Sequence, residues 1–318
     1  MKLLLAIDGG GTRTRCVAVD RDGHRRGEGD AGPSNHLHVP LVTATTALGG
    51  AIERALSSAC ATAGDVVLVS AGLAGVDFDG TGAEDGAGML RTLGFNRTVV
   101  HGDMVIAHRG ALAGLPGIVA LSGTGSSVLG IAADGAMIKA GGWGPLLGDQ
   151  GSAYQLGRLG LVAAAEAFDG SGPATTLLVR LTSALGVSAF PDTVAPLYRD
   201  LSGQQHVAAL APVVDACAEE GDEVAAAICR RAGAGLARTV LAVARRLTAP
   251  DRLVSYQGAV LGRSGLVRAA FLETLGGGGI DIDVRPPRFE PVVGAAWLGA
   301  HAVGWQWPFE RLEAPHGV

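Results

Sequence analysis

The sequence has no excess of basic residues and no long hydrophobic run. Lys and Arg number 25 against 30 Asp and Glu, so the net charge is −5, which argues against nucleic-acid binding as the main task. The first apolar run, Leu3–Ile7, ends at Asp8, too early for a signal peptide. No run approaches ~18 apolar residues, so we predict no membrane span. We expect a cytoplasmic protein that binds neither nucleic acid nor membranes.

Cysteine is scarce. The four cysteines, Cys16, Cys60, Cys217 and Cys229, contain no Cys-x-x-Cys pair, and their spacing suits neither a zinc site nor an iron–sulfur cluster. We expect free thiols in a reducing compartment.

Glycine is abundant by contrast: 50 of 318 residues, about 16%, which is roughly twice the usual share. The glycines have no collagen-like period, and apolar runs separate them, which argues against disorder. We expect them to mark turns where the backbone must approach another group closely.

A strand, a glycine turn and a second strand open the chain and recur near its middle. Leu3–Ile7, the turn Asp8–Thr12 and Thr14–Asp20 form the first unit. A Rossmann unit needs a helix after such a turn, so that fold is not indicated. Ile118–Leu121 and the turn Ser122–Ser126 repeat the pattern, which indicates a weak internal duplication.

Strands alternate with helices in both halves, which predicts two α/β domains that face a cleft. We place the boundary near residue 115. The first domain is expected over 1–115, joined by a C-terminal helix at 291–304. The second is expected over 116–290, with a helical insertion.

Three local expectations bear on the site. A buried strand over Val66–Ser70 should end in the loop Ala71–Gly75. A strand over Arg97–His101 should deliver Asp103 to its end, ahead of a helix from Met104. A further helix should begin at about Gln150.

The two glycine turns have the chemistry of phosphate-binding loops. Asp8–Thr12 offers unobstructed backbone N–H groups, a hydroxyl, and a carboxylate that can hold the water shell of Mg²⁺. Ser122–Ser126 offers similar groups. A structural hairpin turn explains either loop alone equally well. Two such loops, one from each half, favour a nucleoside triphosphate held between two domains.

The sequence resembles the N-acetylglucosamine kinases. The resemblance rests on Asp8–Thr12, Ser122–Ser126 and, most specifically, Gly141–Tyr154, while Pro291–Ala295 matches the start of the family's last helix. That family belongs to the BadF/BadG/BcrA/BcrD ATPase group of the sugar kinase, Hsp70 and actin superfamily. The resemblance implies two ribonuclease H-like domains, ATP and Mg²⁺ in the cleft, phosphorylation of a sugar 6-hydroxyl, and a homodimer.

The candidate site residues follow from the loops and the resemblance together. The nucleotide-binding candidates are Asp8, Gly10, Gly11, Thr12, Gly123, Thr124, Gly125 and Gly258. Asp8 is also the candidate for the magnesium ion. The sugar-binding candidates are Asn35, Gly75, Asp103, Trp143, Gly144 and Asp149. Asp103 is the expected catalytic carboxylate.

Several of these residues also have structural interpretations. Asp103 and Asp149 could each cap a helix, and Asn35 in a Pro-Ser loop is typical of a turn. Two residues of the segment Gly141–Tyr154, which contains the sugar loop that the resemblance implies, depart from the family's pattern. Gln150 stands where many relatives have Glu, and Pro145 stiffens the loop. These two departures leave N-acetylglucosamine and glucosamine both open as substrates.

Two other functions remain as alternatives. An activator ATPase of 2-hydroxyacyl-CoA dehydratases would need an iron–sulfur cluster at a dimer interface, which the cysteine positions do not resemble. A non-catalytic sugar sensor would bind ligands without turnover, and the chain shows no DNA-binding appendage that would favour it.

Overall fold

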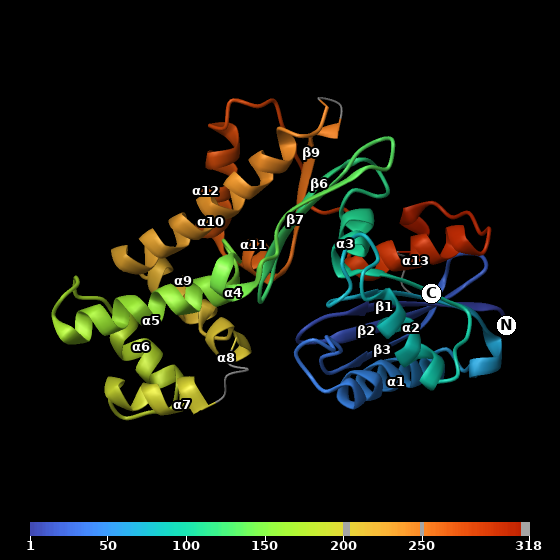
Figure 1. The fold of residues 1–318 in the computed structure, drawn as a ribbon, viewed down its shortest axis with the longest axis horizontal. Helices are drawn as coiled ribbons and strands as arrows, with labels where there is room; N and C mark the ends of the chain where they lie inside the picture. The colour runs from blue at the N-terminus through green and yellow to red at the C-terminus, as the bar shows by residue number, and fades with distance from the viewer. Residues whose placement is uncertain (200–203, 249–250, 313–318) are drawn as a thin grey trace. The chain divides into compact units, whose positions relative to one another are not determined.

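The computed structural model describes residues 1–199, 204–248 and 251–312 (Figure 1). The chain divides into two compact units. Unit 1 is Met1–Val119 with Pro286–Val318, and unit 2 is Ala120–Arg285. Unit 1 is therefore discontinuous in sequence, and unit 2 is inserted within it. Each unit contains one five-stranded sheet.

The sheet of unit 1 has the strand order β3-β2-β1-β4-β5. Its strands are β1 (Leu3–Gly9), β2 (Thr14–Asp20), β3 (Arg25–Ala31), β4 (Val66–Leu73) and β5 (Thr98–Gly102). The first three strands pair antiparallel, whereas β4 is parallel to both β1 and β5. The carboxyl ends of β1, β4 and β5 consequently share one edge.

The second sheet has the order β10-β9-β6-β7-β8. Its strands are β6 (Gly117–Ser122), β7 (Ser126–Ile131), β8 (Met137–Gly141), β9 (Leu253–Gln257) and β10 (Asp283–Val284). Read from β8, this is the order of the first sheet. The predicted fold class of two α/β domains is confirmed, and the repeated sequence pattern corresponds to a repeated topology.

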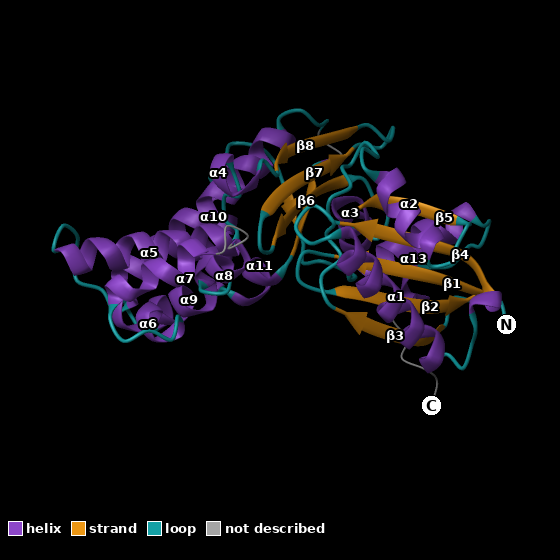
Figure 2. Ribbon diagram, turned by 60° about the horizontal axis from the view of Figure 1, so that its bottom comes forward, coloured by secondary structure: helices purple, strands orange, loops and turns teal. Residues whose placement is uncertain are grey.

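Helices cover both faces of the first sheet (Figure 2). They are α1 (Leu41–Ser58), α2 (Ala83–Thr92), α3 (Asp103–Ala111) and α13 (Pro291–Ala302). Side chains of β1 alternate between two cores: Leu3, Leu5 and Ile7 pack with α1 and α2, while Leu4 and Ala6 pack with α13. Because both faces are covered, β1 is a continuous apolar run.

Unit 2 carries most of the helices. They are α4 (Gly144–Leu147), α5 (Ala153–Asp169), α6 (Leu177–Ala184), α7 (Val194–Arg199), α8 (Gln204–Ala208), α9 (Ala211–Glu219), α10 (Glu223–Ala244), α11 (Ala259–Arg263) and α12 (Gly265–Gly276). A short 3₁₀ turn occupies Phe190–Thr193 in this unit, and two others occupy Ala63–Asp65 and Phe309–Leu312 in unit 1. Asp222 and Ser264 cap α10 and α12, since each side chain accepts a backbone N–H of the first turn. No helix in the described ranges is both long enough and apolar enough to span a membrane.

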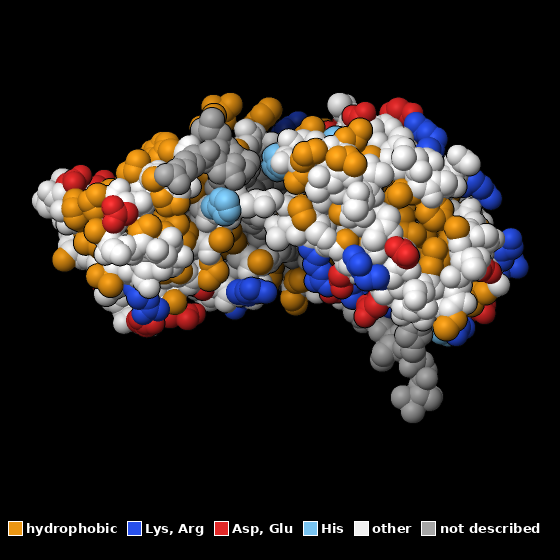
Figure 3. Space-filling view, turned by 90° about the horizontal axis from the view of Figure 1, so that it is seen from below, with side chains coloured by type: hydrophobic (Ala, Val, Ile, Leu, Met, Phe, Trp, Pro, Cys, Tyr) orange, Lys and Arg blue, Asp and Glu red, His pale blue; other side chains and the backbone are white. Residues whose placement is uncertain are grey.

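The alanine-rich stripe of α10 is buried within unit 2. A Cβ at Gly233 would lie 2.1 Å from the carbonyl oxygen of Val267, so α10 and α12 meet backbone to backbone. Hydrophobic side chains are exposed elsewhere in this unit. Val179, Val194 and Tyr198 belong to a helical region whose surface is rich in such side chains in Figure 3.

Several sequence-based boundaries were wrong. Ala71–Leu73 continues β4, because these residues pair with both β1 and β5, so the predicted loop starts later. The helix expected from Gln150 begins at Ala153, where the Ser152 hydroxyl accepts the Gln155 N–H. Strand β8 and helix α11 were not predicted. The burial of β8 does not alternate, which removes the usual strand signal.

Candidate active site

The first glycine turn is a tight hairpin between β1 and β2. Gly9 pairs with Thr14, and the Gly10 N–H donates to the Arg13 carbonyl at 2.9 Å. Thr12 is exposed at the tip, and a Cβ at Gly11 would meet no protein atom within 4 Å. The space in front of this backbone is therefore open.

Asp8 lies at the carboxyl end of β1, beside this turn. Its carboxylate makes no hydrogen bond or ion pair with any residue of the described ranges. Burial above all, and then the negative charge of Asp103, raise its pKa to about 7, although the positive charge of Arg15 opposes both effects. Arg15, opposite Asp8 on β2, is itself paired with Glu290 at 2.6 Å and Glu28 at 3.2 Å. Asp8 is thus an acid placed where its own charge is disfavoured.

Asp103 is the first residue of α3, directly after β5. The helix cap is Gly102, so the alternative interpretation of Asp103 as the helix cap was wrong. The Met104 N–H donates to its Oδ1 at 2.8 Å and so orients the carboxylate. A Cβ at Gly72, the β4 residue paired with Asp8, would lie 2.3 Å from Ile106. The missing side chain lets α3 lie directly on the sheet, which brings Asp103 to the edge that carries Asp8.

Asn35 and Gly75 lie in contact, although they are far apart in sequence. A Cβ at Gly75, whose φ is +99°, would be 2.9 Å from Asn35 Oδ1. That oxygen already accepts the Leu37 N–H at 3.1 Å, which is the turn interaction expected of Asn in this loop. The segment after Gly75 packs against β5, because a Cβ at Gly102 would lie 2.6 Å from the Val76 carbonyl. One edge of the unit 1 sheet therefore carries four of its candidate residues: Asp8, Asn35, Gly75 and Asp103.

The second glycine turn, Ser122–Ser126, joins β6 to β7 and is bound to the segment that precedes α5. The Gly123 and Thr124 carbonyls accept the N–H groups of Ala153 and Tyr154 at 2.9 and 3.1 Å. The Ser126 hydroxyl donates to the Gln150 carbonyl at 2.8 Å. The turn and the predicted sugar loop therefore form one structure.

Gly258 packs against the same turn. Its φ is +104°, and a Cβ there would lie 2.3 Å from the Ser122 carbonyl oxygen. Only glycine fits both that conformation and that contact. A Cβ at Gly123, in contrast, would meet no protein atom within 4 Å. The turn is thus fixed on one side and open at Gly123.

Asp149 is a buried carboxylate of unit 2, with 4% of its surface exposed. It adopts the left-handed conformation, with φ of +58°. Ser152 caps α5, so the interpretation of Asp149 as the helix cap was wrong. The Ser126 N–H donates to Asp149 Oδ1 at 3.3 Å, and the Gln204 side-chain amide donates to Oδ2 at 3.3 Å. Gln204 was not identified from the sequence.

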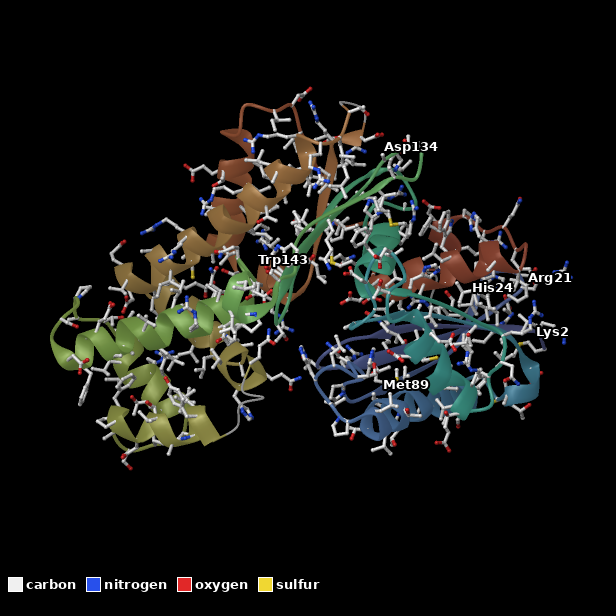
Figure 4. All side chains as sticks on the ribbon, in the orientation of Figure 1. Lys2, Arg21, His24, Met89, Asp134 and Trp143 are labelled. Carbon is white, nitrogen blue, oxygen red and sulfur yellow. The ribbon has the colours of Figure 1, made fainter. Side chains whose placement is uncertain are left out.

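Trp143 and Gly144 begin the short helix α4. Trp143, labelled in Figure 4, is 71% exposed. A Cβ at Gly148 would lie 3.2 Å from Trp143 Cβ, so Trp143 packs beside the bend that leads to Asp149. Gly144 has φ of +79°, and a Cβ there would face open space. The structure thus places both residues next to the Asp149 segment, with the indole ring accessible.

A second acidic cluster lies away from these groups. Asp20, Asp22 and His24 could offer ligand atoms to one metal ion, and no other group in the described ranges has such spacing. They surround the β2–β3 turn, near the amino end of β1, and Figure 4 labels His24 there. Asp20 is already paired with Arg26 at 2.5 Å. This cluster was not predicted, and its contacts explain it structurally.

The Asp8 carboxyl generates a test of stability against pH. Its folded pKa of about 7 exceeds the ordinary value of 3.8, so between these values the folded state holds a proton that the unfolded state has released. The free energy of unfolding should therefore fall as pH rises through this window. In Asp8→Asn this loss is absent, and at pH 8 the variant should be more stable than wild type by about 1 kcal/mol or more. Urea unfolding of both proteins at pH 5 and pH 8 measures these free energies. A difference between variant and wild type that is the same at both pH values would contradict this account.

Comparisons with known proteins find relatives over most of the chain. An N-acetylmuramic acid/N-acetylglucosamine kinase of Clostridium acetobutylicum is 30% identical over 257 residues, covering 80% of this chain and 83% of that protein. An N-acetyl-D-glucosamine kinase of Dictyostelium discoideum is 28% identical over 314 residues, covering 95% and 98%. A solved structure from Chromobacterium violaceum, provisionally assigned as an N-acetylglucosamine kinase, superposes with a TM-score of 0.76 at 26% identity, covering 94% and 99%.

The family model for the BadF/BadG/BcrA/BcrD ATPases matches residues 5–299, nearly the whole chain. This range includes both glycine turns and every candidate site residue. The chain belongs to the BadF/BadG/BcrA/BcrD ATPase family.

Proposed function

We propose that this chain is an ATP-dependent kinase that phosphorylates the 6-hydroxyl of N-acetylglucosamine or a closely related amino sugar. The observation that carries the proposal is the pair of glycine turns at matching positions of the two sheets, each beside an acidic residue. Two curated relatives are named as kinases of N-acetylglucosamine, and one of them also of N-acetylmuramic acid.

The nucleotide is assigned to the two turns. The turn that contains Gly10, Gly11 and Thr12 would bind phosphate oxygens through backbone N–H groups at its tip and the Thr12 hydroxyl. The open space at Gly11 and Gly123 supports this assignment, because phosphate can approach the backbone there. Thr124 and Gly125 complete the second turn. Gly258, packed on Ser122, would line the adenosine side.

The residues present fit a magnesium ion. Asp8 offers hard oxygen ligands that no described residue engages, and a nearby cation would offset the repulsion between Asp8 and Asp103. We assign Asp8 to the ion, directly or through its water shell. When bound, Mg²⁺ would neutralise charge on the β- and γ-phosphates.

Asp103 is assigned as the general base. It accepts the proton of the 6-hydroxyl while that oxygen bonds to the γ-phosphorus and the bond from this phosphorus to the bridging oxygen breaks, releasing ADP. The Met104 N–H holds one carboxylate oxygen, which fixes the orientation of the base. Its placement at a strand's carboxyl end is usual for reactive groups in α/β sheets.

The sugar is assigned to Asn35 and Gly75 from unit 1, and to Trp143, Gly144 and Asp149 from unit 2. The Gln150 amide oxygen accepts from the Gln155 side-chain amide at 2.5 Å, which does not decide between the two amino sugars, so glucosamine stays an alternative substrate. A homodimer, implied by the resemblance, is part of the proposal.

The rival iron–sulfur activator is disfavoured by the cysteines. All four lie in the described residues; Cys16, Cys217 and Cys229 are buried, and Cys60 alone is exposed. Burial raises the pKa of Cys229 to about 12, which disfavours the thiolate that a cluster requires. An interface cluster has no adequate ligand set here.

The function is tested by ATP consumption, in a coupled assay, with N-acetylglucosamine, glucosamine, N-acetylmannosamine, N-acetylmuramic acid and glucose. We expect sugar-dependent turnover that is fastest with an N-acetylated amino sugar, and a 6-phosphate product by ³¹P NMR. ATP hydrolysis independent of sugar would favour an ATPase, and sugar binding without turnover would favour a sensor.

Replacement of the proposed base gives a second test. Asp103→Asn keeps the shape but cannot take the proton, so kcat should fall by ~10²–10⁴-fold. ATP affinity should be unchanged, because the nucleotide contacts lie in the turns. Asp22→Asn, at the far end of the same sheet, is the control and should retain full activity. Turnover of Asp103→Asn within a few-fold of wild type would remove Asp103 as the base.

The second turn is tested by Gly123→Val. No protein atom lies within 4 Å of the added Cβ, so the variant should fold, while the side chain should obstruct the phosphate and weaken ATP binding about tenfold or more. Gly276→Val, at the exposed end of α12, is the matched control, since its Cβ also meets open space. Calorimetric titration with ATP measures both. Unchanged affinity in Gly123→Val would exclude this turn from the nucleotide site.

A further inference from the structure

Gln204 is the first residue of α8, and its side-chain amide donates to Asp149 Oδ2 at 3.3 Å. The other carboxylate oxygen accepts the Ser126 N–H from the start of β7 at 3.3 Å. The buried carboxylate is therefore held from two sides, by the sheet and by the helical region. Gln204 is the side chain from that helical region that reaches the proposed sugar site in the described structure.

The position of Gln204 depends on how α8 lies on α5. A Cβ at Gly157, within α5, would be 2.0 Å from the Val207 carbonyl oxygen and 3.0 Å from its carbon. Any side chain at position 157 would push the α8 backbone away. Glycine within a helix costs roughly 0.5–1 kcal/mol relative to Ala, and the contact with α8 gives its physical reason here.

The bond to Gln204 matters because the backbone alone does not orient the carboxylate. The left-handed bend fixes the Asp149 backbone, but the side chain can still rotate about its own bonds. An amide donor orients an ionised carboxylate without adding charge, and hydrogen bonds to charged groups are stronger than neutral ones. The carboxylate of Asp149 is then held in one orientation, as an acceptor of sugar hydroxyls must be.

We propose that Gln204 is a positioning residue of the sugar subsite, which holds the Asp149 carboxylate in place through α8, with Gly157 setting the distance between α8 and α5. This role rests on the proposed sugar-binding function of Asp149. Gln204 acts through Asp149 and does not itself contact substrate.

The test is steady-state kinetics of Gln204→Met, which keeps the length of the side chain but removes the donor. With N-acetylglucosamine varied at saturating ATP, KM for the sugar should rise about tenfold, the loss of one hydrogen bond to a charged group. KM for ATP should be unchanged and kcat should stay within about threefold. His206→Met, at an exposed position of the same helix, is the control and should leave both constants unchanged.

Gly157→Ala tests the same inference by a different route. In an ordinary helix this change is stabilising, but here it should lower the melting temperature and raise KM for the sugar, because α8 is displaced. Melting curves of every variant separate displacement from unfolding. An unchanged sugar KM in a folded Gly157→Ala protein would overturn the role of this contact.

A double-mutant cycle with Asp149→Asn separates the positioning role of Gln204 from the proposed sugar-binding role of Asp149. Asn tolerates the left-handed backbone, so this variant should fold and raise KM for the sugar. In its background Gln204→Met should have a smaller effect than in wild type, because the bond is no longer to a charge. Additive effects, or a silent Gln204→Met beside an impaired Asp149→Asn, overturn the role of Gln204 alone. An Asp149→Asn protein with unchanged sugar KM overturns the proposed sugar site as well.

Discussion

Direct backbone-to-backbone packing at glycine positions is the constraint on which both halves of the site depend. Gly258 meets the Ser122 carbonyl, and Gly157 meets the Val207 carbonyl, at separations that no Cβ could occupy. Gly72 similarly admits Ile106 of α3 onto the sheet. Because protein interiors are close-packed, an added methyl group at these points would displace a whole element. The high glycine content is therefore as much a packing property as a turn property.

Charge is distributed unequally between the units. Unit 1 places Asp8 and Asp103 on one sheet edge, where each disfavours the charge of the other. Unit 2 holds the buried carboxylate of Asp149 beside its glycine turn, where amide donors contact it from two sides. The first arrangement suits a site completed by cations and phosphate, while the second suits neutral hydroxyl groups. The duplicated sheets have thus acquired different local electrostatics on a shared topology.

The sequence could predict those features that local chemistry determines. Strand β2 over Thr14–Asp20 and the caps at Asp222 and Ser264 follow from short-range patterns. The extension of β4 through Leu73 could not be predicted, because pairing with β1 and β5 overrides the loop-like composition of Ala-Gly-Leu.

The site was predictable only in part, for a related reason. Motifs identified Asp8, Asp103 and Asp149 individually, and the structure shows what surrounds each of them. The contact between Asn35 and Gly75 and the bond from Gln204 to Asp149 join segments distant in sequence. Gln204 has no motif of its own, and its position follows from the packing of α8 on Gly157. Tertiary packing, rather than local pattern, supplies these contacts.

The discontinuity of unit 1 has a consequence for its synthesis. Helix α13 supplies Val292, Ala295 and Ala296 to the core beneath Leu4 and Ala6, and the Ser70 hydroxyl donates to the Ala295 carbonyl at 2.7 Å. The ribosome makes these residues after all of unit 2. One apolar face of the first sheet must therefore wait without α13, covered only by the Ile106 side of α3, while the inserted unit, continuous in sequence, emerges and folds. The nascent chain consequently depends on α13, made after the whole inserted unit, to complete the core of strands made before it.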